Sequence, residues 1–277
     1  MLAHEIHIRD PFVIAENNQY YLLGTTGDDP WGRASDLTLY QSNDLRNFEV
    51  KCVMVNDGSL DEYTNIWAPE MHKYKGKYYL ILSAFRKDLG RGSFIFVSDN
   101  LDDNFKMLTG KYITPAGWGC LDATLFVQDD IPYLCFSNEW TTPISNDGDG
   151  SLFIAQLSDD LTELVGEPKK IVSGKNCPYA IEVGDEKCRG YIAEGPFLYE
   201  ENENTILLWS TVTKTGYSVL KSVSRNGAMG DYSLEEVVFD KDGGHCMRFK
   251  DLDGKQWITF HQPNITPNER MKLFDMN

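Results

Sequence analysis

One short block decides the fold of this chain, and its first copy is residues 10–24, DPFVIAENNQYYLLG. The block has an apolar stretch, a polar turn and a second apolar stretch, which is the pattern of a β-hairpin. It recurs four more times, as APEMHKYKGKYYLILS (68–83), DATLFVQDDIPYLCFS (122–137), GPFLYEENENTILLWS (195–210) and HCMRFKDLDGKQWITF (245–260). Recurrence of one unit along a chain indicates a repeat architecture.

Further strand candidates lie between the hairpins, for example residues 37–42, 93–98, 151–157 and 217–223. Each unit therefore predicts a four-stranded antiparallel sheet. Such sheets repeated around an axis make a β-propeller, so we expect an all-β chain with five blades. A closed ring leaves no linker, and residues 1–277 are predicted to form one domain. A β-sandwich is the alternative, but it does not explain a repeated first strand.

Composition narrows the classes of partner. The chain has 277 residues and a net charge of -16, which argues against nucleic acid and disfavours an anionic membrane surface. It contains no stretch of about 18 apolar residues, and residues 1–9 do not resemble a secretion signal. None of the six cysteines forms a Cys-x-x-Cys pair, and we expect buried thiols in a reducing compartment, the cytoplasm. A disulfide between Cys177 and Cys188 is the alternative.

Three acidic residues stand at the start of three of the blocks: Asp10, Asp122 and Glu194. In a propeller the first strand of each blade lines the central channel, so these carboxylates should meet at one mouth. Ala68 or Glu70 from the second block and His245 from the fifth should join them. Hydrolysis of a glycosidic bond needs one protonated and one ionised carboxyl group, and a third charge helps to separate their pKa values.

The motifs around these residues resemble those of glycoside hydrolase family 43. They are Arg9-Asp10-Pro11, Trp67-Ala68-Pro69-Glu70, Leu121-Asp122-Ala123 and Ala193-Glu194-Gly195-Pro196, in that order over nearly the whole chain. The resemblance implies a five-bladed propeller that cleaves arabinose- or xylose-containing glycans with inversion. It also implies that Asp10 is the general base, Glu194 the general acid, and Asp122 the residue that orients Glu194 and raises its pKa. Two departures are Ala123, where Pro is common, and Glu70, where Asp is commoner.

Other site residues follow from the same resemblance. It implies that His245 lies at the channel centre, often beside a hydrated calcium ion, although a hydrogen-bonded channel histidine explains it equally well. No cofactor is expected to be required. His261 and Arg270 are predicted to contact substrate hydroxyls, and Arg270 could instead pair with an acidic neighbour. Trp67 is predicted to pack against a sugar ring, although core packing is the commoner use of Trp. Weaker candidates of the same kind are Trp31, Trp118 and Trp140.

These expectations predict an inverting exo-glycosidase that releases a terminal pentose from an oligosaccharide. The first choice is an α-L-arabinofuranosidase acting on arabinoxylan-type oligosaccharides, because the C-terminal sandwich of many β-xylosidases is missing after residue 277. A β-xylosidase or an endo-arabinanase of the same fold stays open. From other classes, a non-catalytic glycan-binding propeller would not need an acid and a base. A glycoside phosphorylase would need an Arg and His cluster for phosphate, which the block starts lack.

Overall fold

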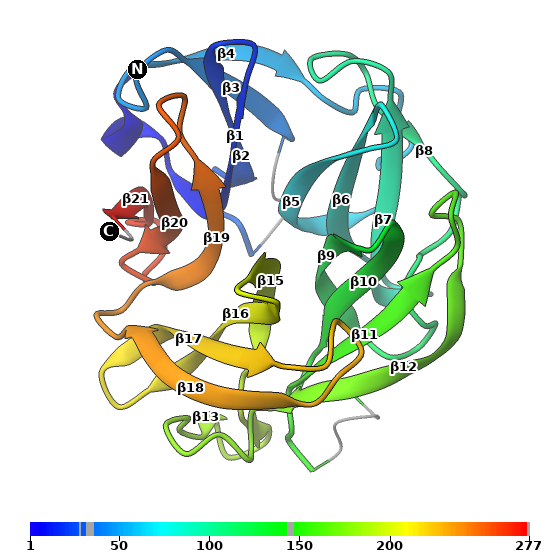
Figure 1. Cartoon of the computed structure of the whole chain (residues 1–277), viewed down its shortest axis with the longest axis vertical. Helices are drawn as coiled ribbons and strands as arrows, with labels where there is room; N and C mark the ends of the chain where they lie inside the picture. The colour runs from blue at the N-terminus through cyan, green and yellow to red at the C-terminus, as the bar shows by residue number, and fades with distance from the viewer. Residues whose placement is uncertain (28, 32–35, 143–146, 276–277) are drawn as a thin grey trace.

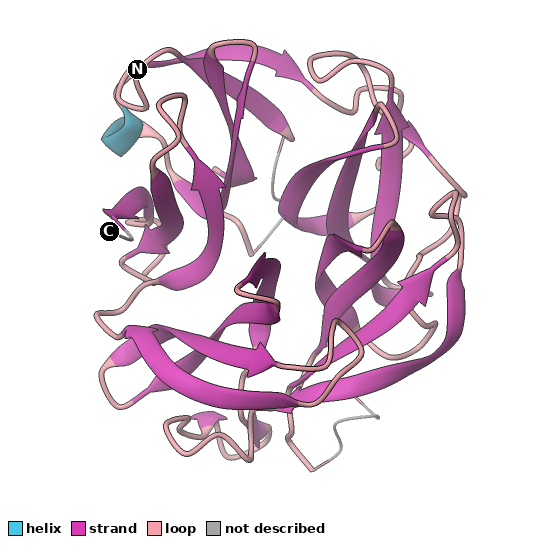
Figure 2. Ribbon diagram, in the orientation of Figure 1, coloured by secondary structure: helices cyan, strands magenta, loops and turns pink. Residues whose placement is uncertain are grey.

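The computed structural model describes residues 1–27, 29–31, 36–142 and 147–275. Five antiparallel sheets stand around a central axis like the blades of a propeller (Figure 1). The described chain is almost entirely strand and loop, with one short 3-10 helix, η1 (Ala3–Glu5) (Figure 2). The prediction of a five-bladed all-β propeller is therefore confirmed.

The strands of the first three blades run outward from the axis in chain order. Blade 1 holds β1 (Ile8–Glu16), β2 (Gln19–Thr26), β3 (Thr38–Ser42) and β4 (Phe48–Val53). Blade 2 holds β5 (Thr64–Tyr74), β6 (Lys77–Arg86), β7 (Gly90–Ser98) and β8 (Lys106–Met107). Blade 3 holds β9 (Cys120–Gln128), β10 (Ile131–Asn138), β11 (Ser151–Leu157) and β12 (Leu164–Ser173).

The last two blades follow a small two-stranded sheet formed by β13 (Val183–Gly184) and β14 (Arg189–Gly190). Blade 4 holds β15 (Glu194–Glu201), β16 (Asn204–Thr213), β17 (Gly216–Ser224) and β18 (Tyr232–Phe239). Blade 5 holds β19 (Gly244–Lys250), β20 (Gln256–Gln262) and β21 (Arg270–Asp275). The prediction of four strands in every unit is wrong for blade 5, which has three in the described chain. Its outer strand lies beside η1 instead, and Arg270 Nε donates to the carbonyl of His4 (2.7 Å).

The innermost strand of every blade carries the same β-bulge. Two of its residues face one residue of the second strand, and the first of the two has a left-handed φ. This first residue, which we call the bulge residue, is Asp10 (φ 54°), Ala68 (44°), Asp122 (53°), Gly195 (57°) and His245 (53°) in blades 1 to 5. Non-glycine residues seldom adopt this conformation, so five aligned copies indicate a constraint that the ring imposes.

The amide of the bulge residue shows what that constraint is. In three blades it donates to a buried hydroxyl on the second strand of the preceding blade, and each bond is 2.8 Å long: Ala68 to Thr25, Asp122 to Ser83, and His245 to Ser210. At the closure of the ring, the amide of Asp10 donates to Nδ1 of His261 (3.2 Å). Each of these acceptors therefore fastens the bulge of the next blade.

The bulge corrects the alignment of the repeats. Glu194 does not occupy the position of Asp10, because the bulge residue of blade 4 is Gly195. Glu194 instead pairs with Ser210, as Arg9 pairs with Thr25 in blade 1. A side chain at Gly195 would meet the His245 ring, with Cβ only 2.9 Å from Cγ, so only glycine fits there. The acid of blade 4 is accordingly one residue earlier than the other two.

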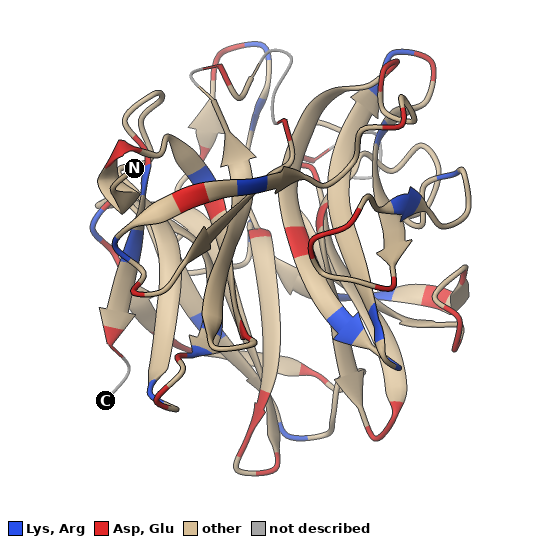
Figure 3. Cartoon of the chain, turned by 90° about the horizontal axis from the view of Figure 1, so that it is seen from above, with Lys and Arg blue, Asp and Glu red and all other residues tan. Residues whose placement is uncertain are grey.

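Apolar clusters fill the spaces between neighbouring blades. A large cluster joins blades 1, 2 and 5, and three further clusters join blades 2 and 3, 3 and 4, and 4 and 5. Many of the acidic residues lie in the loops and turns between strands (Figure 3). All six cysteines are free, so the alternative disulfide between Cys177 and Cys188 does not form. No helix of the described chain is long and apolar enough to cross a membrane.

Replacing the buried hydroxyl of Ser210 tests the fastening of the bulge. Ser210→Ala leaves the amide of His245 without its acceptor, and we expect the free energy of unfolding to fall by about 1–3 kcal/mol in urea denaturation. The matched control is Ser98→Ala, because the Ser98 hydroxyl accepts only an amide in an exposed turn, from Asn100 (3.2 Å). That variant should stay within about 0.5 kcal/mol of wild type. Equal losses from the two variants would contradict the proposed constraint.

Candidate active site

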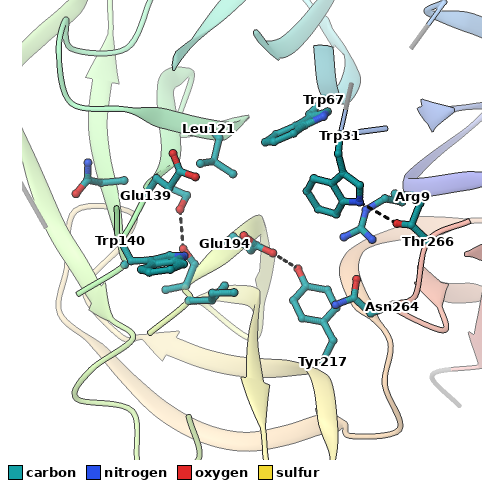
Figure 4. A pocket seen from close by; sticks show the side chains of 15 residues that line it. Arg9, Trp31, Trp67, Leu121, Glu139, Trp140, Glu194, Tyr217, Asn264 and Thr266 are labelled. Atoms are coloured by element: carbon teal, nitrogen blue, oxygen red, sulfur yellow. Dashed lines mark hydrogen bonds between the residues drawn. The ribbon is translucent and has the colours of Figure 1, made fainter. Parts of the chain in front are cut away.

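Two adjoining cavities open where the first strands of the blades begin. The outer cavity has a volume of about 410 Å³ and is lined by residues from all five blades and from their connecting loops (Figure 4). The inner cavity, of about 50 Å³, shares with it Arg9, Trp31, Trp67, Leu121 and Glu194. It is also lined by Asp10, Asp122 and His245, so the three predicted catalytic carboxylates surround one small space. That space exceeds the roughly 10–15 Å³ that one water molecule needs.

Asp10 is held as an ionised carboxylate. Its Oδ2 accepts a hydrogen bond from Thr25 Oγ1 (2.7 Å), and its Oδ1 lies 3.1 Å from Nδ1 of His245. Burial raises the pKa of Asp10, but His245, Arg9 and the Thr25 hydrogen bond outweigh burial and bring the pKa below its ordinary value. Asp10 is thus ionised at neutral pH, which is the state that a general base requires.

His245 stands between two carboxylates. Its Nδ1 is 3.1 Å from Asp10 Oδ1 and 3.7 Å from Asp122 Oδ2. Burial lowers the pKa of His245, but the charges of Asp10, Asp122 and Glu194 outweigh burial and raise the pKa above its ordinary value. The imidazolium is therefore favoured, and its Nδ1 lies beside Asp10.

The surroundings of His245 do not form a calcium cage. Calcium takes six to eight oxygen ligands, and no group of three or more His, Cys, Asp or Glu side chains in the described ranges is arranged to hold a metal ion. Nδ1 of His245 also lies 3.1 Å from Asp10 Oδ1. A calcium ion held by His245 and water stays a prediction, and the chemistry below does not pass through it.

Asp122 is the most deeply buried of the three acids, with 4% of its side chain exposed. Its Oδ2 accepts a hydrogen bond from the amide of Gly195 (3.1 Å), the residue after Glu194. Burial raises the pKa of Asp122, the charges of Glu194 and Asp10 add to this rise, and His245 opposes it, so that the pKa is about 7. Asp122 thus fixes the backbone that carries Glu194 and interacts electrostatically with its carboxyl group.

Glu194 has the surroundings of a proton donor. Burial raises its pKa above the ordinary value, and the hydrogen bond that its Oε1 accepts from the hydroxyl of Tyr217 (2.7 Å) opposes the rise (Figure 4). Glu194 is therefore protonated at a pH where Asp10 is already ionised. An acid and a base with separated pKa values in one cavity suit acid–base hydrolysis.

The sequence did not single out Arg9 and Tyr217 as site residues. Arg9 lines both cavities, and its Nη1 pairs with Glu269 Oε1 (2.5 Å). It precedes the bulge residue, as do Trp67, Leu121 and Glu194, which also line the outer cavity. A repeat alignment in the correct register would have found Arg9 from this shared position. Tyr217 belongs to a third strand and carries no comparable signal.

His261 and Arg270 lie outside both cavities. His261 is fully buried behind Asp10, and its Nε2 is 3.1 Å from Asn264 Oδ1. Arg270 donates to the backbone carbonyls of His4, Pro267 and Glu269, not to an acidic side chain. Neither side chain is placed to contact a substrate in the cavities as predicted, because the one is packed behind the base and the other fastens η1. Asn264 and Thr266, from the loop between them, line the outer cavity instead.

The four predicted aromatic candidates differ in position. Trp67 and Trp31 line both cavities and meet edge to face, with ring centroids 5.4 Å apart. Trp140 lines the outer cavity on the other side of Glu194 (Figure 4). Trp118 packs against Phe153 (5.1 Å) in an apolar cluster and lines neither cavity. Trp67 therefore has the place that was predicted for it, whereas Trp118 has a core role.

A comparison with known families agrees with this geometry. The model of a family described as glycosyl hydrolases family 43 matches residues 5–274. The chain belongs to this family. It is therefore a glycosidase, and the resemblance seen in its motifs is confirmed.

Three proteins similar to this chain are described as arabinofuranosidases or as an arabinase. An extracellular exo-α-(1→5)-L-arabinofuranosidase of Streptomyces chartreusis is 27% identical over 219 residues, or 77% of this chain, which spans 57% of that protein. A second one, ArbA of Cellvibrio japonicus, is 22% identical over 99% of this chain and 84% of its own. The structure of an endo-arabinase from Bacteroides thetaiotaomicron superposes with a TM-score of 0.89 at 29% identity, covering 100% of this chain and 96% of that one.

Two substitutions of this family 43 enzyme should move the pH dependence of kcat/KM in opposite directions. The rate falls as rising pH removes the proton from Glu194, so this falling limb follows the pKa of Glu194 in the free enzyme. Tyr217→Phe removes a hydrogen bond that lowers this pKa, and the limb should move to higher pH. Asp122→Asn keeps an acceptor for Gly195 but removes a carboxyl group that gains a negative charge near pH 7 and then opposes ionisation of Glu194, so the limb should move to lower pH. Shifts of the same sign would contradict the assigned environment of Glu194.

Proposed function

We propose that the enzyme is an inverting exo-acting α-L-arabinofuranosidase in which Asp10 is the general base and Glu194 the general acid. The observation that carries the proposal is the inner cavity, which Asp10 and Glu194 line with pKa values shifted in opposite directions. In an inverting glycosidase the two carboxyl groups stand far enough apart to admit a water molecule. The volume of the inner cavity supports such an arrangement.

The reaction follows from these two protonation states. Asp10 accepts a proton from a water molecule as the water oxygen bonds to the anomeric carbon, on the face opposite the leaving group. Glu194 donates its proton to the glycosidic oxygen as the bond from that oxygen to the anomeric carbon breaks. One proton is taken up and one is given, so the enzyme ends with Asp10 protonated and Glu194 ionised. Exchange of these protons with solvent restores the starting state.

His245 and Asp122 prepare the two reacting groups. The imidazolium of His245 and the hydroxyl of Thr25 hold Asp10 ionised before the reaction. The carboxyl group of Asp122 holds the backbone beside Glu194, and its ionised form would oppose ionisation of that side chain. We assign Asp122 as a positioning residue, because it binds the backbone amide of Gly195, next to the acid.

A contact across the rim supports action on chain ends. Trp31 Nε1 donates to Thr266 Oγ1 (3.0 Å) (Figure 4). Thr266 in turn donates to Glu269 Oε1 (2.7 Å), the partner of Arg9. This chain of contacts joins the loops of blades 1 and 5 beside the inner cavity. Such a junction would block a glycan that runs past the inner cavity on this side and would favour the binding of a chain end.

The choice of sugar rests on the relatives. The two described as exo-α-(1→5)-L-arabinofuranosidases and the endo-arabinase favour arabinofuranosyl linkages. They point to linear α-1,5-linked arabino-oligosaccharides at least as much as to arabinoxylan. A cytoplasmic location stays a prediction: free cysteines suit it, whereas both curated relatives are described as extracellular.

Product analysis tests the sugar and the mode of attack. We expect release of arabinose from an aryl α-L-arabinofuranoside and from linear arabinan, with little action on an aryl β-xyloside. The first sugar product should have the inverted anomeric configuration by NMR. Release of oligosaccharides from arabinan at early times would identify an endo-arabinanase, and preference for the xyloside a β-xylosidase. Absence of hydrolysis on all three would favour glycan binding without catalysis.

Leaving-group dependence tests the two catalytic roles. Glu194→Ala should lower kcat/KM strongly, by about 100-fold or more, on arabino-oligosaccharides and far less on aryl glycosides with good leaving groups, which need little protonation. Asp10→Ala should abolish turnover of both, because both need an activated water. Circular dichroism and thermal unfolding check that the variants are folded. Equal losses from Glu194→Ala on the two substrate types would refute its role as the acid.

A further inference from the structure

A buried guanidinium outside the two cavities lacks hydrogen-bond partners. Arg91, on β7, has 10% of its side chain exposed, and its Nε and Nη1 are buried without a partner in the described structure. Its Cζ lies 3.8 Å from the centroid of the Trp67 ring. The nearest acidic oxygen, Glu139 Oε2, is 3.8 Å from Nε, which is too far for a hydrogen bond.

Such a group is costly to keep. Burial opposes the charge of Arg91 and lowers its pKa, and Glu139 and Asp122 compensate only through space. A buried charge without hydrogen bonds costs more stability than an apolar side chain of the same size. A partner that completes the hydrogen bonds would therefore bind with a favourable contribution from Arg91.

A third cavity lies next to this guanidinium. It has a volume of about 260 Å³ and is lined by Arg91 and Glu139 together with Phe85, Leu89, Thr141 and Thr142. Glu139 also lines the outer cavity, so the two spaces meet at its side chain. Glu139 and Trp140 lie on the side of Glu194 away from Arg9, Trp31 and Trp67 (Figure 4). The third cavity thus adjoins the outer cavity at Glu139, on the side of Glu194 where the leaving group would lie, and it reaches back to Trp67 through Arg91.

We propose that this cavity is a second leaving-group subsite, in which Arg91 and Glu139 bind the hydroxyl groups of a neutral sugar. A guanidinium donor beside a carboxylate acceptor matches a pair of neighbouring hydroxyls, which both accept and donate. A sugar acid fits less well, because Glu139 would repel its carboxylate. The inference rests on the proposed glycosidase function and adds that the leaving group is an oligosaccharide of at least two units.

The ratio of kcat/KM for a trisaccharide to that for a disaccharide isolates this subsite. Both substrates place one sugar at the mouth of the inner cavity and one beyond Glu194, but only the trisaccharide reaches Arg91. The series uses the pentose whose aryl glycoside the wild-type enzyme cleaves. Arg91→Met keeps an apolar stem against Trp67, and we expect it to lower the ratio about 10- to 100-fold. The matched control is Arg86→Met, at a solvent-exposed ion pair with Asp88, which should leave the ratio unchanged.

Glu139→Gln is a second, independent test. Glu139 lies at the surface of the cavity, so its substitution should not disturb the fold even if Arg91→Met does. It should lower the ratio in the same direction and by less. Equal losses on the two substrates would show that Arg91 only supports Trp67, and an unchanged ratio in both variants would show that no sugar binds there; either would overturn the subsite. Wild-type enzyme inactive on every aryl pentoside would overturn the proposed function and this inference with it.

Discussion

The bulge in the innermost strands is the constraint on which the site depends. A left-handed residue lies at the same place in each blade, and its amide turns to the neighbouring blade. In blades 1, 3 and 5 its side chain lines the inner cavity. The cost of this backbone conformation is offset by a buried hydrogen bond from that amide, as Ser83 and Ser210 provide. Because every bond of this kind joins one blade to the next, the contacts that hold the ring together also place Asp10, Asp122 and His245 around one cavity.

The same crowding separates the protonation states. Three acids in a buried space cannot all ionise, and the contacts of each decide which of them do. Asp10 receives the hydroxyl of Thr25 and the imidazolium of His245, so its ionised form is stabilised despite burial. For Glu194, the hydroxyl of Tyr217 and the more distant charges of His245 and Arg9 do not outweigh burial. For Asp122, His245 and the amide of Gly195 do not outweigh it either. The order of their pKa values thus follows from the number and charge of their partners, not from differences in exposure.

Patterns within one strand were enough to predict the hairpins, the number of blades and the identity of the three acids. Local patterns could not fix the alignment between blades. The motifs Asp10-Pro11 and Glu194-Gly195-Pro196 suggest that Glu194 corresponds to Asp10, whereas the bulge shows that Gly195 does. Contacts between residues far apart in the sequence could not be predicted either. Arg270 donates to backbone carbonyls instead of reaching the site. Arg9 lines the cavity, where it pairs with Glu269 from the other end of the chain.

The closure of the ring shows how the base and the acid are linked. At the position where other blades use a hydroxyl, blade 5 has His261, whose Nδ1 accepts the amide of Asp10 and whose Nε2 meets Asn264 Oδ1. These two bonds require a neutral imidazole with its proton on Nε2, in agreement with a pKa that burial lowers to about 3. The ring also stacks on Tyr217 (5.5 Å), the residue that holds Glu194. A serine could accept the amide but could not reach Tyr217, so the histidine connects the backbone of Asp10 to the partner of Glu194 through two rigid rings.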